Sequence, residues 1–300
     1  MNAEQLAHAL GAVRSGRQWK CRCVAHDDAG PSMILFDGKS RVQVRCLAGC
    51  ETLDVIAALK ARGLWHGEPE GSGALRVSQP AEREASADRE QQRMRDRARR
   101  IWDETTECDG TMAEDYLDRR QIWTVAKELP GIVRFHPRCP RGHDLAPAIV
   151  VAMRGFASNA VQAIQRIFLT PDACKDGHPM MLGPAGGAAM KLQRVHGVEL
   201  HIAEGLETAL SIKAMGSGPI WALGSTSGIK ALPVFEGLER LVIWADHDPL
   251  NPRTGKRPGF DAAEVCATRW RGAGRQVQVW FPEKEQWDAA DVWSDRCARR

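Results

Sequence analysis

The chain has 300 residues, of which 43% are hydrophobic and 26% charged, and its formal net charge is +3 at pH 7. This length accommodates two domains and a small accessory module, and the composition is that of an ordinary globular protein. The charge is too small to indicate a nucleic-acid partner unless basic residues cluster locally. No apolar run reaches the roughly 18 residues of a membrane span, and residues 1–5 do not resemble a secretory signal. We therefore expect a cytoplasmic protein with no membrane partner.

Cysteines near the N-terminus have the spacing of a metal site. Cys23 and His26 form one pair, and Cys46 and Cys50 form a second pair about twenty residues later. A predicted hairpin, with strands at 32–36 and 42–45, brings the pairs together. Three thiolates and one imidazole predict one closed, tetrahedral, structural Zn²⁺ site. Cys21 is a rival for Cys23, which we favour because two residues separate it from His26.

This segment resembles the CHC2-type zinc ribbon of bacterial and phage DNA primases. The residues that carry the resemblance are Cys23, His26, Asp27, Asp28, Pro31, Ser32, Met33, Val42, Val44, Cys46 and Cys50. In those primases the ribbon helps to engage the template, so the resemblance implies single-stranded DNA as a partner. The chain departs from the usual pattern by having three residues, instead of two, between its last two cysteines.

The middle of the chain begins with a predicted linker and a predicted charged helix. After a predicted helix at 53–60, residues 67–80 have the composition of a flexible linker. The charged segment 81–107 predicts a helix, whose arginines belong either to a solvated face or to a phosphate-binding surface. Another helix is predicted at 111–125.

Strands follow in the second part of this middle region. They are predicted at 132–135, 148–153 and 160–168, the last two as a hairpin with a longer loop. His136, Cys139 and His143 lie close together in the sequence, but they lack a fourth ligand at a convincing spacing. We therefore interpret residues 135–143 as a loop and not as a second metal site.

From residue 198 onward, strands and helices alternate. The predicted strands are 198–203, 219–223, 240–245 and 276–281, and the predicted helices are 206–215, 228–235 and 259–271. Such alternation is typical of a parallel sheet covered by helices. The fold class is therefore α/β.

Acidic residues follow two of these strands. Glu204 comes after the first strand, and Asp246 and Asp248 come after the third. Ligands bind at the carboxyl ends of parallel strands, and carboxylates grouped there suit Mg²⁺ or Mn²⁺. The alternative is helix capping, which we favour for Glu207 and Asp261 taken singly.

These acids resemble the two signature motifs of the Toprim domain, which occurs in primases, topoisomerases and some nucleases. The resemblance covers roughly residues 196–293. It implies that Glu204, Asp246 and Asp248 are the catalytic set, with Glu204 as the general acid/base and the two aspartates binding the metal. A late acidic motif of the family resembles Asp288 and Asp291, which become further magnesium candidates. Segments at 116–120, 169–171 and 186–192 also resemble phage and mobile-element primases.

Basic residues are needed to hold nucleotide phosphates and template. Lys191 and Arg194 are the leading candidates for this role, because they lie just before the first Toprim strand. Lys230 follows a loop of small residues, 224–228, in which phosphate can approach backbone N–H groups. Arg119, Arg120 and Arg166 come next. Each of these bases is otherwise a solvated surface charge.

Together the resemblances imply a DNA primase, similar to bacterial DnaG-type enzymes, that makes short RNA primers from nucleoside triphosphates. The expected domains are a zinc ribbon (1–65), a charged linker and helix (66–110), a small α+β part of the core (111–195) and a Toprim catalytic core (196–300). A Toprim nuclease and a non-catalytic single-stranded-DNA-binding accessory protein are the alternatives. A topoisomerase needs a nucleophilic tyrosine, and Tyr116 lies outside the Toprim region. No P-loop motif occurs, so a helicase would be a separate partner.

Overall fold

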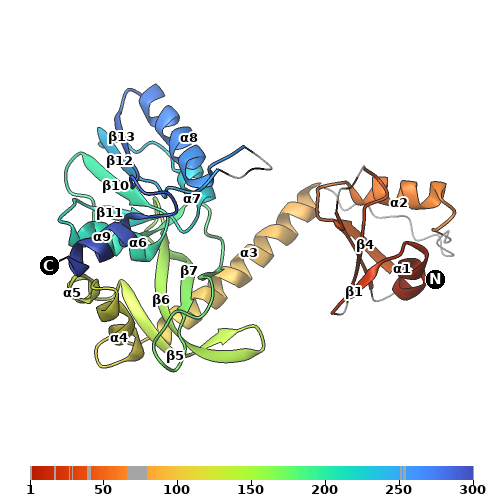
Figure 1. Ribbon diagram of the computed structural model, residues 1–300, viewed down its shortest axis with the longest axis horizontal. Coiled ribbons are helices and arrows are strands. Elements are labelled where there is room, and N and C mark those ends of the chain that lie inside the picture. Colours follow the sequence, from red (N-terminus) through yellow and green to blue (C-terminus); the bar gives the residue numbers. More distant parts are fainter. Residues whose placement is uncertain are drawn as a thin grey trace. The chain divides into compact units, whose positions relative to one another are not determined.

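The computed structural model describes residues 2–16, 18–26, 28, 30–38, 42–65, 80–250, 252 and 255–299, with the side chains of the first long helix described from Ala87 onward. The chain divides into two compact units, Met1–Val77 and Ser78–Arg300 (Figure 1). The expected linker, 67–80, lies outside the described residues except for Pro80. Among the helices that are described, none is both long and apolar enough to cross a membrane.

The first unit is a four-stranded antiparallel sheet with two helices. Its elements are α1 (Ala3–Ala9), β1 (Val13–Ser15), β2 (Gln18–Cys21), β3 (Met33–Asp37), β4 (Val42–Cys46) and α2 (Thr52–Ala61). Residues of β3 and β4 alternate between buried and more exposed positions, as expected for a sheet with one covered face. Leu35 and Val44 face each other across the ladder and share a buried core with Leu59 of α2. The predicted hairpin and helix are confirmed, whereas α1, β1 and β2 were not predicted.

The second unit is built on one large mixed sheet. Its elements are α3 (Pro80–Asp103), α4 (Met112–Arg119), α5 (Trp123–Lys127), β5 (Val133–Arg141), β6 (Asp144–Gly155), β7 (Val161–Phe168), β8 (Met180–Leu182), β9 (Ala188–Lys191), β10 (Glu199–Ala203), α6 (Leu206–Ala214), β11 (Ile220–Ala222), α7 (Thr226–Ala231), β12 (Arg240–Trp244), α8 (Pro258–Gly272), β13 (Gln276–Trp280) and α9 (Ala289–Ala298). The strand order is β13-β12-β10-β11-β9-β6-β7-β8, and β5 pairs with β6 outside this path.

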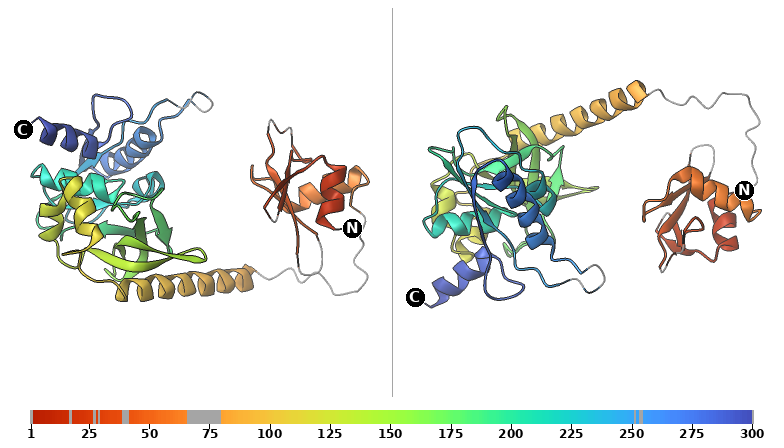
Figure 2. Two further views of the ribbon diagram at one scale, coloured as in Figure 1. Left: turned by 60° about the horizontal axis from the view of Figure 1, so that its bottom comes forward. Right: turned by 90° about the horizontal axis from the view of Figure 1, so that it is seen from above.

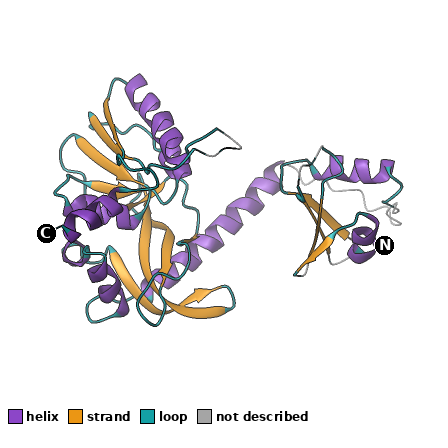
Figure 3. Cartoon of the chain, in the orientation of Figure 1, coloured by secondary structure: helices purple, strands orange, loops and turns teal. Residues whose placement is uncertain are grey.

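The four strands at one end of this sheet, β13, β12, β10 and β11, are parallel, as predicted. Ala203 of β10 pairs with Trp244 of β12 and with Ala222 of β11, so the carboxyl ends of these strands lie level. Helices cover both faces (Figure 3). One face packs against α6 and α9, and the other packs against α7 and α8. The α/β fold class is confirmed.

The remaining strands form an antiparallel extension of the sheet. β9 joins the two parts, since it pairs antiparallel to both β11 and β6. β6 and β7 form the predicted hairpin, and α3 packs against β7 (Figure 2). The end of α3 contributes Ala98, Ile101 and Trp102 to a core beneath β7. At least this part of the charged helix is therefore a packed element of the second unit.

Three sequence predictions are corrected in this unit. Residues 111–125 form two helices instead of one, because Gln121 has a left-handed φ of 56° that ends α4. Residues 135–141 belong to a long β-ladder with a bulge between His136 and Cys139, and only 142–143 form a turn. The helix expected at 228–235 begins earlier, at Thr226, where Ser225 caps it. It also ends earlier, because Leu232 precedes a proline and has extended backbone.

Candidate functional site

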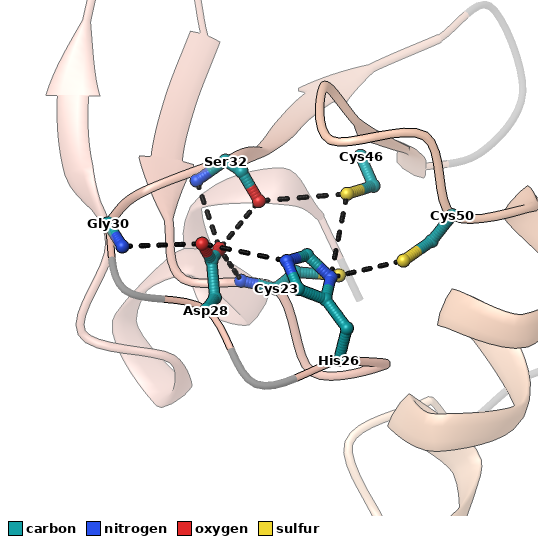
Figure 4. Close-up of polar contacts among 7 residues, drawn as sticks. All are labelled: Cys23, His26, Asp28, Gly30, Ser32, Cys46 and Cys50. Carbon is teal, nitrogen blue, oxygen red and sulfur yellow. Dashed lines mark hydrogen bonds and ion pairs between the residues drawn. The ribbon is translucent and has the colours of Figure 1, made fainter. Parts of the chain in front are cut away.

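The four predicted zinc ligands lie together at one end of the first sheet. Cys23 follows β2, Cys46 ends β4, and Cys50 stands in the turn after β4. Their ligand atoms and that of His26 all lie within 4.8 Å of one another (Figure 4). His26 Nδ1 is 3.1 Å from Cys50 Sγ and 3.9 Å from Cys46 Sγ. We call these four residues the Cys–His cluster; three thiols and one imidazole fit one tetrahedral zinc ion.

Cys21 does not take part in the Cys–His cluster. It lies two residues earlier, within β2, and its side chain is buried in the core of the unit. Burial raises the pKa of the Cys21 thiol to about 11, and that of Cys50 is raised to about 11 as well, so the position of Cys21 outside the cluster, and not its pKa, distinguishes it. For Cys46 burial also acts to raise the pKa, but hydrogen bonds, led by the backbone N–H of Cys50, lower it to about 6. The thiol of Cys46 is thus prepared to ionise.

Asp28 organises the loop that carries two of these ligands. Its Oδ2 accepts hydrogen bonds from the backbone N–H of Cys23 at 2.7 Å and of Ser32 at 3.2 Å, and its Oδ1 accepts from Gly30 at 3.3 Å. Asp28 Oδ1 also lies 3.6 Å from His26 Nε2, the ring nitrogen that faces away from the thiols. A carboxylate in this position orients a ligating histidine. The Ser32 hydroxyl and these N–H groups hold the pKa of Asp28 well below its usual range.

The second group of predicted residues lies at the carboxyl ends of the parallel strands. Glu204 directly follows β10, and Asp246 follows β12 after one further residue. Burial, and then the charge of Asp248, raise the pKa of Glu204. Burial, followed by the charges of Asp288, Glu204, Asp248 and Asp291, raises the pKa of Asp246 to about 7. These five acids therefore share one electrostatic environment, which we call the acidic site.

The acidic site has features that fit a divalent cation. Asp246 Oδ1 is buried, and it accepts no hydrogen bond from the described part of the chain. A buried carboxylate oxygen without a partner is costly unless a cation or a donor compensates for it. Oxygen ligands of this kind suit Mg²⁺ or Mn²⁺. Among the described residues, only the Cys–His cluster has three or more ligand atoms all within 4.8 Å, so the carboxylates are spaced more widely.

Asp248 also has a structural contact. Its Oδ2 accepts a hydrogen bond of 2.6 Å from the backbone N–H of Gly259, in the first turn of α8. Gly259 packs so closely that a Cβ there would lie 2.8 Å from the carbonyl oxygen of Asp246 and 3.0 Å from Asp248 Oδ2. The first turn of α8 thus supports both aspartates.

The late acids, Asp288 and Asp291, form a capping box at the start of α9. Asp288 Oδ1 accepts from the backbone N–H of Asp291 at 2.9 Å, and Asp291 Oδ2 accepts from that of Asp288 at 3.0 Å. Asp288 Oδ2 also accepts from the Thr208 hydroxyl at 2.8 Å. Helix capping accounts for these contacts, and a role of the two residues as metal ligands stays a prediction.

A polar cavity of about 340 Å³ adjoins the acidic site, and its central residue, Glu207, was not predicted to be functional. Glu207 does not cap its helix: it accepts hydrogen bonds from the Tyr116 hydroxyl and, at 2.5 Å, from Lys175 Nζ. Arg120 Nη2 lies 3.6 Å from the same carboxylate. Despite burial, which acts to raise it, these partners lower the pKa of Glu207. The walls also include Arg119 and Asp288, so cations stand beside one of the carboxylates of the acidic site.

The leading basic candidates, Lys191 and Arg194, do not line the acidic site. Lys191 Nζ donates to the carbonyl oxygens of Gly155, at 2.8 Å, and Phe156, at 3.1 Å. Lys191 and Arg194 line a separate cavity of about 960 Å³, and none of the five acids belongs to the wall that the described residues form. Lys230 is exposed at the end of α7. Their roles in holding nucleotide phosphates remain predictions.

The small residues of the loop 224–228, just before Lys230, are required for close packing. A Cβ on Gly228 would lie 2.4 Å from the carbonyl oxygen of Leu223, a separation that no side chain permits. The backbone N–H of Gly228 donates to the capping hydroxyl of Ser225 at 3.1 Å. Gly224, with φ of 78°, hydrogen bonds through its N–H to the carbonyl oxygen of Glu204. These contacts fix the strand ends around Glu204 and account for the glycines without a phosphate.

Two domain families match the chain. Residues 199–298 match the Toprim domain, and residues 92–192 match a domain of unknown function, DUF7146. No curated protein matches. The acidic site thus falls within the Toprim match, as the resemblance of the two acidic motifs predicted.

Similar solved structures include three primases. The zinc-binding and RNA polymerase domains of the Aquifex aeolicus primase are 13% identical, with a TM-score of 0.45, over 99% of this chain and 81% of that one. The primase fragment of the bacteriophage T7 primase-helicase is 15% identical, with a TM-score of 0.41, over 62% of this chain and 66% of that one. A primase domain from Pseudomonas aeruginosa is 13% identical, with a TM-score of 0.44, over 69% and 78%.

Proposed function

We propose that this chain, whose residues 199–298 form a Toprim domain, is a DNA primase that synthesises short RNA primers on single-stranded DNA. The observation that carries the proposal is the environment of Asp246. Its buried Oδ1 lacks a partner among the described residues, and four other carboxylates help to raise its pKa to about 7, at the strand ends where a parallel sheet binds its ligand. Such a concentration of negative charge suits a divalent cation and its phosphate substrate.

In this reaction a 3′-hydroxyl attacks the α-phosphate of a nucleoside triphosphate, a new P–O bond forms, and pyrophosphate leaves. Asp246 and Asp248 would hold Mg²⁺ or Mn²⁺, which supplies charge neutralisation and orients the phosphates. Glu204 would accept the proton of the attacking hydroxyl. Its raised pKa makes it a better proton acceptor than an exposed carboxylate.

The cations around Glu207 supply a place for the phosphates of the nucleotide. Lys175 and Arg120 are held at the buried carboxylate of Glu207, in a cavity that reaches Asp288. We propose that Arg119 and Arg120, together with Lys175, stabilise the charge on the leaving pyrophosphate. Glu207 and Tyr116 position them. The phenol of Tyr116 is buried and donates to Glu207, an arrangement that does not suit the attacking group of a topoisomerase.

The first unit would hold the template. Its Cys–His cluster fits one structural zinc, and the primases that it resembles use such a ribbon to engage single-stranded DNA. Residues 1–300 contain no P-loop motif, so they would not themselves supply a helicase motor.

Incubation of the protein with single-stranded DNA, labelled ribonucleotides and Mg²⁺ tests this proposal. Asp246→Asn keeps the shape of the side chain and removes its charge. The matched control is Glu239→Gln, because Glu239 is exposed at the opposite end of β12. Primers from the wild type and the control, but not from Asp246→Asn, would support the proposal. Template cleavage without primers would favour the nuclease, and the absence of both products would favour a DNA-binding accessory protein.

A further inference from the structure

One cavity in the described part of the second unit lies apart from the acidic site. Its volume is about 960 Å³, within the range of ligand pockets in proteins. We call it the basic cavity; its walls include Arg154, Phe156, Lys191, Arg194, Trp221 and Phe235. Residues 195–197 lead into β10 and residues 236–238 lead into β12. These segments therefore stand at the strand ends opposite to Glu204 and Asp246.

The basic cavity carries positive charge that is not neutralised within the described protein. None of the described ion pairs includes Arg154, Lys191 or Arg194. Among the described wall residues the one acid is Glu236, which is exposed. Burial, and then the charge of Arg154, lower the pKa of Lys191, so these two cations are close enough to repel each other. An anion between them would relieve both the repulsion and the loss of solvation.

The wall beside these cations is aromatic. Phe156 and Trp221 are stacked, with ring centroids 6.2 Å apart and an interplanar angle of 10°, and Phe235 meets both rings edge-on. Lys191 Nζ lies 4.8 Å from the centre of the Trp221 ring. Phe156 and Phe235 are only half-buried. Aromatic rings next to positive charge that is not paired with an acid are the usual means of binding an unpaired base together with its phosphate.

Gln193 is a fixed part of the cavity wall. Its Oε1 is buried without a partner among the described residues. The backbone of Gln193 is fixed, because its carbonyl oxygen accepts a hydrogen bond of 3.1 Å from Trp221 Nε1. Because Oε1 is buried, a ligand in the cavity does not reach it.

We infer that the basic cavity is a second nucleotide-binding site, separate from the acidic site, in which Arg154 and Arg194 bind a phosphate and the aromatic wall packs against the base. The unit bound is one unpaired nucleotide, which either belongs to a single strand or is free. Binding here needs neither a divalent cation nor turnover, so the inference is independent of the proposed primase reaction.

Binding is measured with the full chain carrying Asp246→Asn, so that no synthesis occurs. The probe is a labelled single strand of about ten nucleotides, followed by fluorescence anisotropy at several salt concentrations. We expect the double variant Arg154→Gln, Arg194→Ala to weaken binding about tenfold. The slope of the logarithm of the binding constant against the logarithm of the salt concentration should also become less steep, by roughly 0.7 for each phosphate that is no longer neutralised. Arg271→Ala, which removes one exposed charge on α8, is the control and should change neither value. Equal affinities for all three proteins would overturn the inference.

Photo-crosslinking gives a readout that a loss of folding would not produce. Photo-crosslinks from an iodouracil-containing strand should map to the peptides around Phe156 or Trp221. Protection of those peptides by ATP would assign the site to free nucleotides, and protection by the oligonucleotide alone would assign it to a strand. Crosslinks found only elsewhere would contradict the inference.

Discussion

Thr208 donates its hydroxyl to Asp288 Oδ2 at 2.8 Å, and this bond joins the helix that follows Glu204 to the cap of the last helix. The threonine is removed from solvent, since Thr208 is 4% exposed. The same Asp288 raises the pKa of Asp246. Helix docking and the electrostatics of the acidic site thus depend on one carboxylate.

Replacing Thr208 with valine should therefore destabilise the second unit. Valine keeps the shape but cannot donate, so Asp288 loses one partner. We expect a loss of about 1 kcal/mol in the free energy of unfolding, seen as a melting temperature lower by about 2–4 °C. Thr208→Ser, which retains the hydroxyl, is the control. Equal melting temperatures for the valine and wild-type proteins would show that the bond contributes nothing to stability.

The pH dependence of stability should reflect Asp246. Its pKa of about 7 exceeds the usual value of 3.8, so the folded chain holds this proton more tightly than the unfolded chain does. The resulting stabilisation is complete below about pH 4 and is lost as the pH rises to about 7, a change on the order of 4 kcal/mol. Asp246→Asn has no such loss.

Melting temperatures of the two proteins, in buffer without added divalent cations, test this point. The advantage of Asp246→Asn over the wild type should grow from pH 5 to pH 8. An advantage that is the same at both pH values would indicate that Asp246 has an ordinary pKa in the folded protein.

Divalent cations should restore the stability that the wild type loses as the pH rises. If Mg²⁺ binds at Asp246, adding it at ten times its dissociation constant stabilises the folded chain by about 1.4 kcal/mol. The melting temperature of the wild type and of Glu239→Gln should then rise at pH 8, and that of Asp246→Asn should not. A rise of equal size in all three proteins would place the cation elsewhere.

Zinc content distinguishes the two neighbouring cysteines of the first unit. Cys46→Ser removes one of four ligands, and we expect the bound zinc to fall from one ion per chain toward none. Cys21→Ser is the matched control, because Cys21 is buried nearby but lies outside the Cys–His cluster. It should retain a full equivalent of zinc, as measured by atomic absorption. Loss of zinc from Cys21→Ser with retention in Cys46→Ser would reverse the assignment.

Much of the parallel sheet was predictable, because β10 and β12 are short apolar runs that end at acids. Their carboxyl ends must meet at one edge if the strands are parallel, and the register of Ala203 with Trp244 confirms this. The hairpin between Cys23 and Cys46 was predictable from two short strand-like runs, 32–36 and 42–45, that are joined at Asp37 and Gly38. In both cases, one local pattern determined both the element and its partner.

Other features depend on contacts that no local pattern reveals. Residues 135–143 contain two prolines, which argue against a strand, yet β5 contains both. Pro137 lies in the bulge, and Pro140 lies beyond Phe135, the residue of β5 that also bridges to Thr106. The end of α4 rests on a left-handed Gln121, a conformation in which glycine would have been expected. Glu207 and Lys175 are 32 residues apart and meet only once the sheet has formed.

The tight packing of Gly259 makes the spacing of the aspartate pair adjustable from outside the acidic site. A methyl group at this position has no room beside the Asp246 carbonyl oxygen, so an alanine must displace either the first turn of α8 or the backbone that carries both aspartates. Gly259→Ala therefore alters the distance between two carboxylates while every carboxylate remains in the chain. A series of substitutions of increasing size at Gly259 would separate the effect of the distance between the carboxylates from the effect of removing a carboxylate.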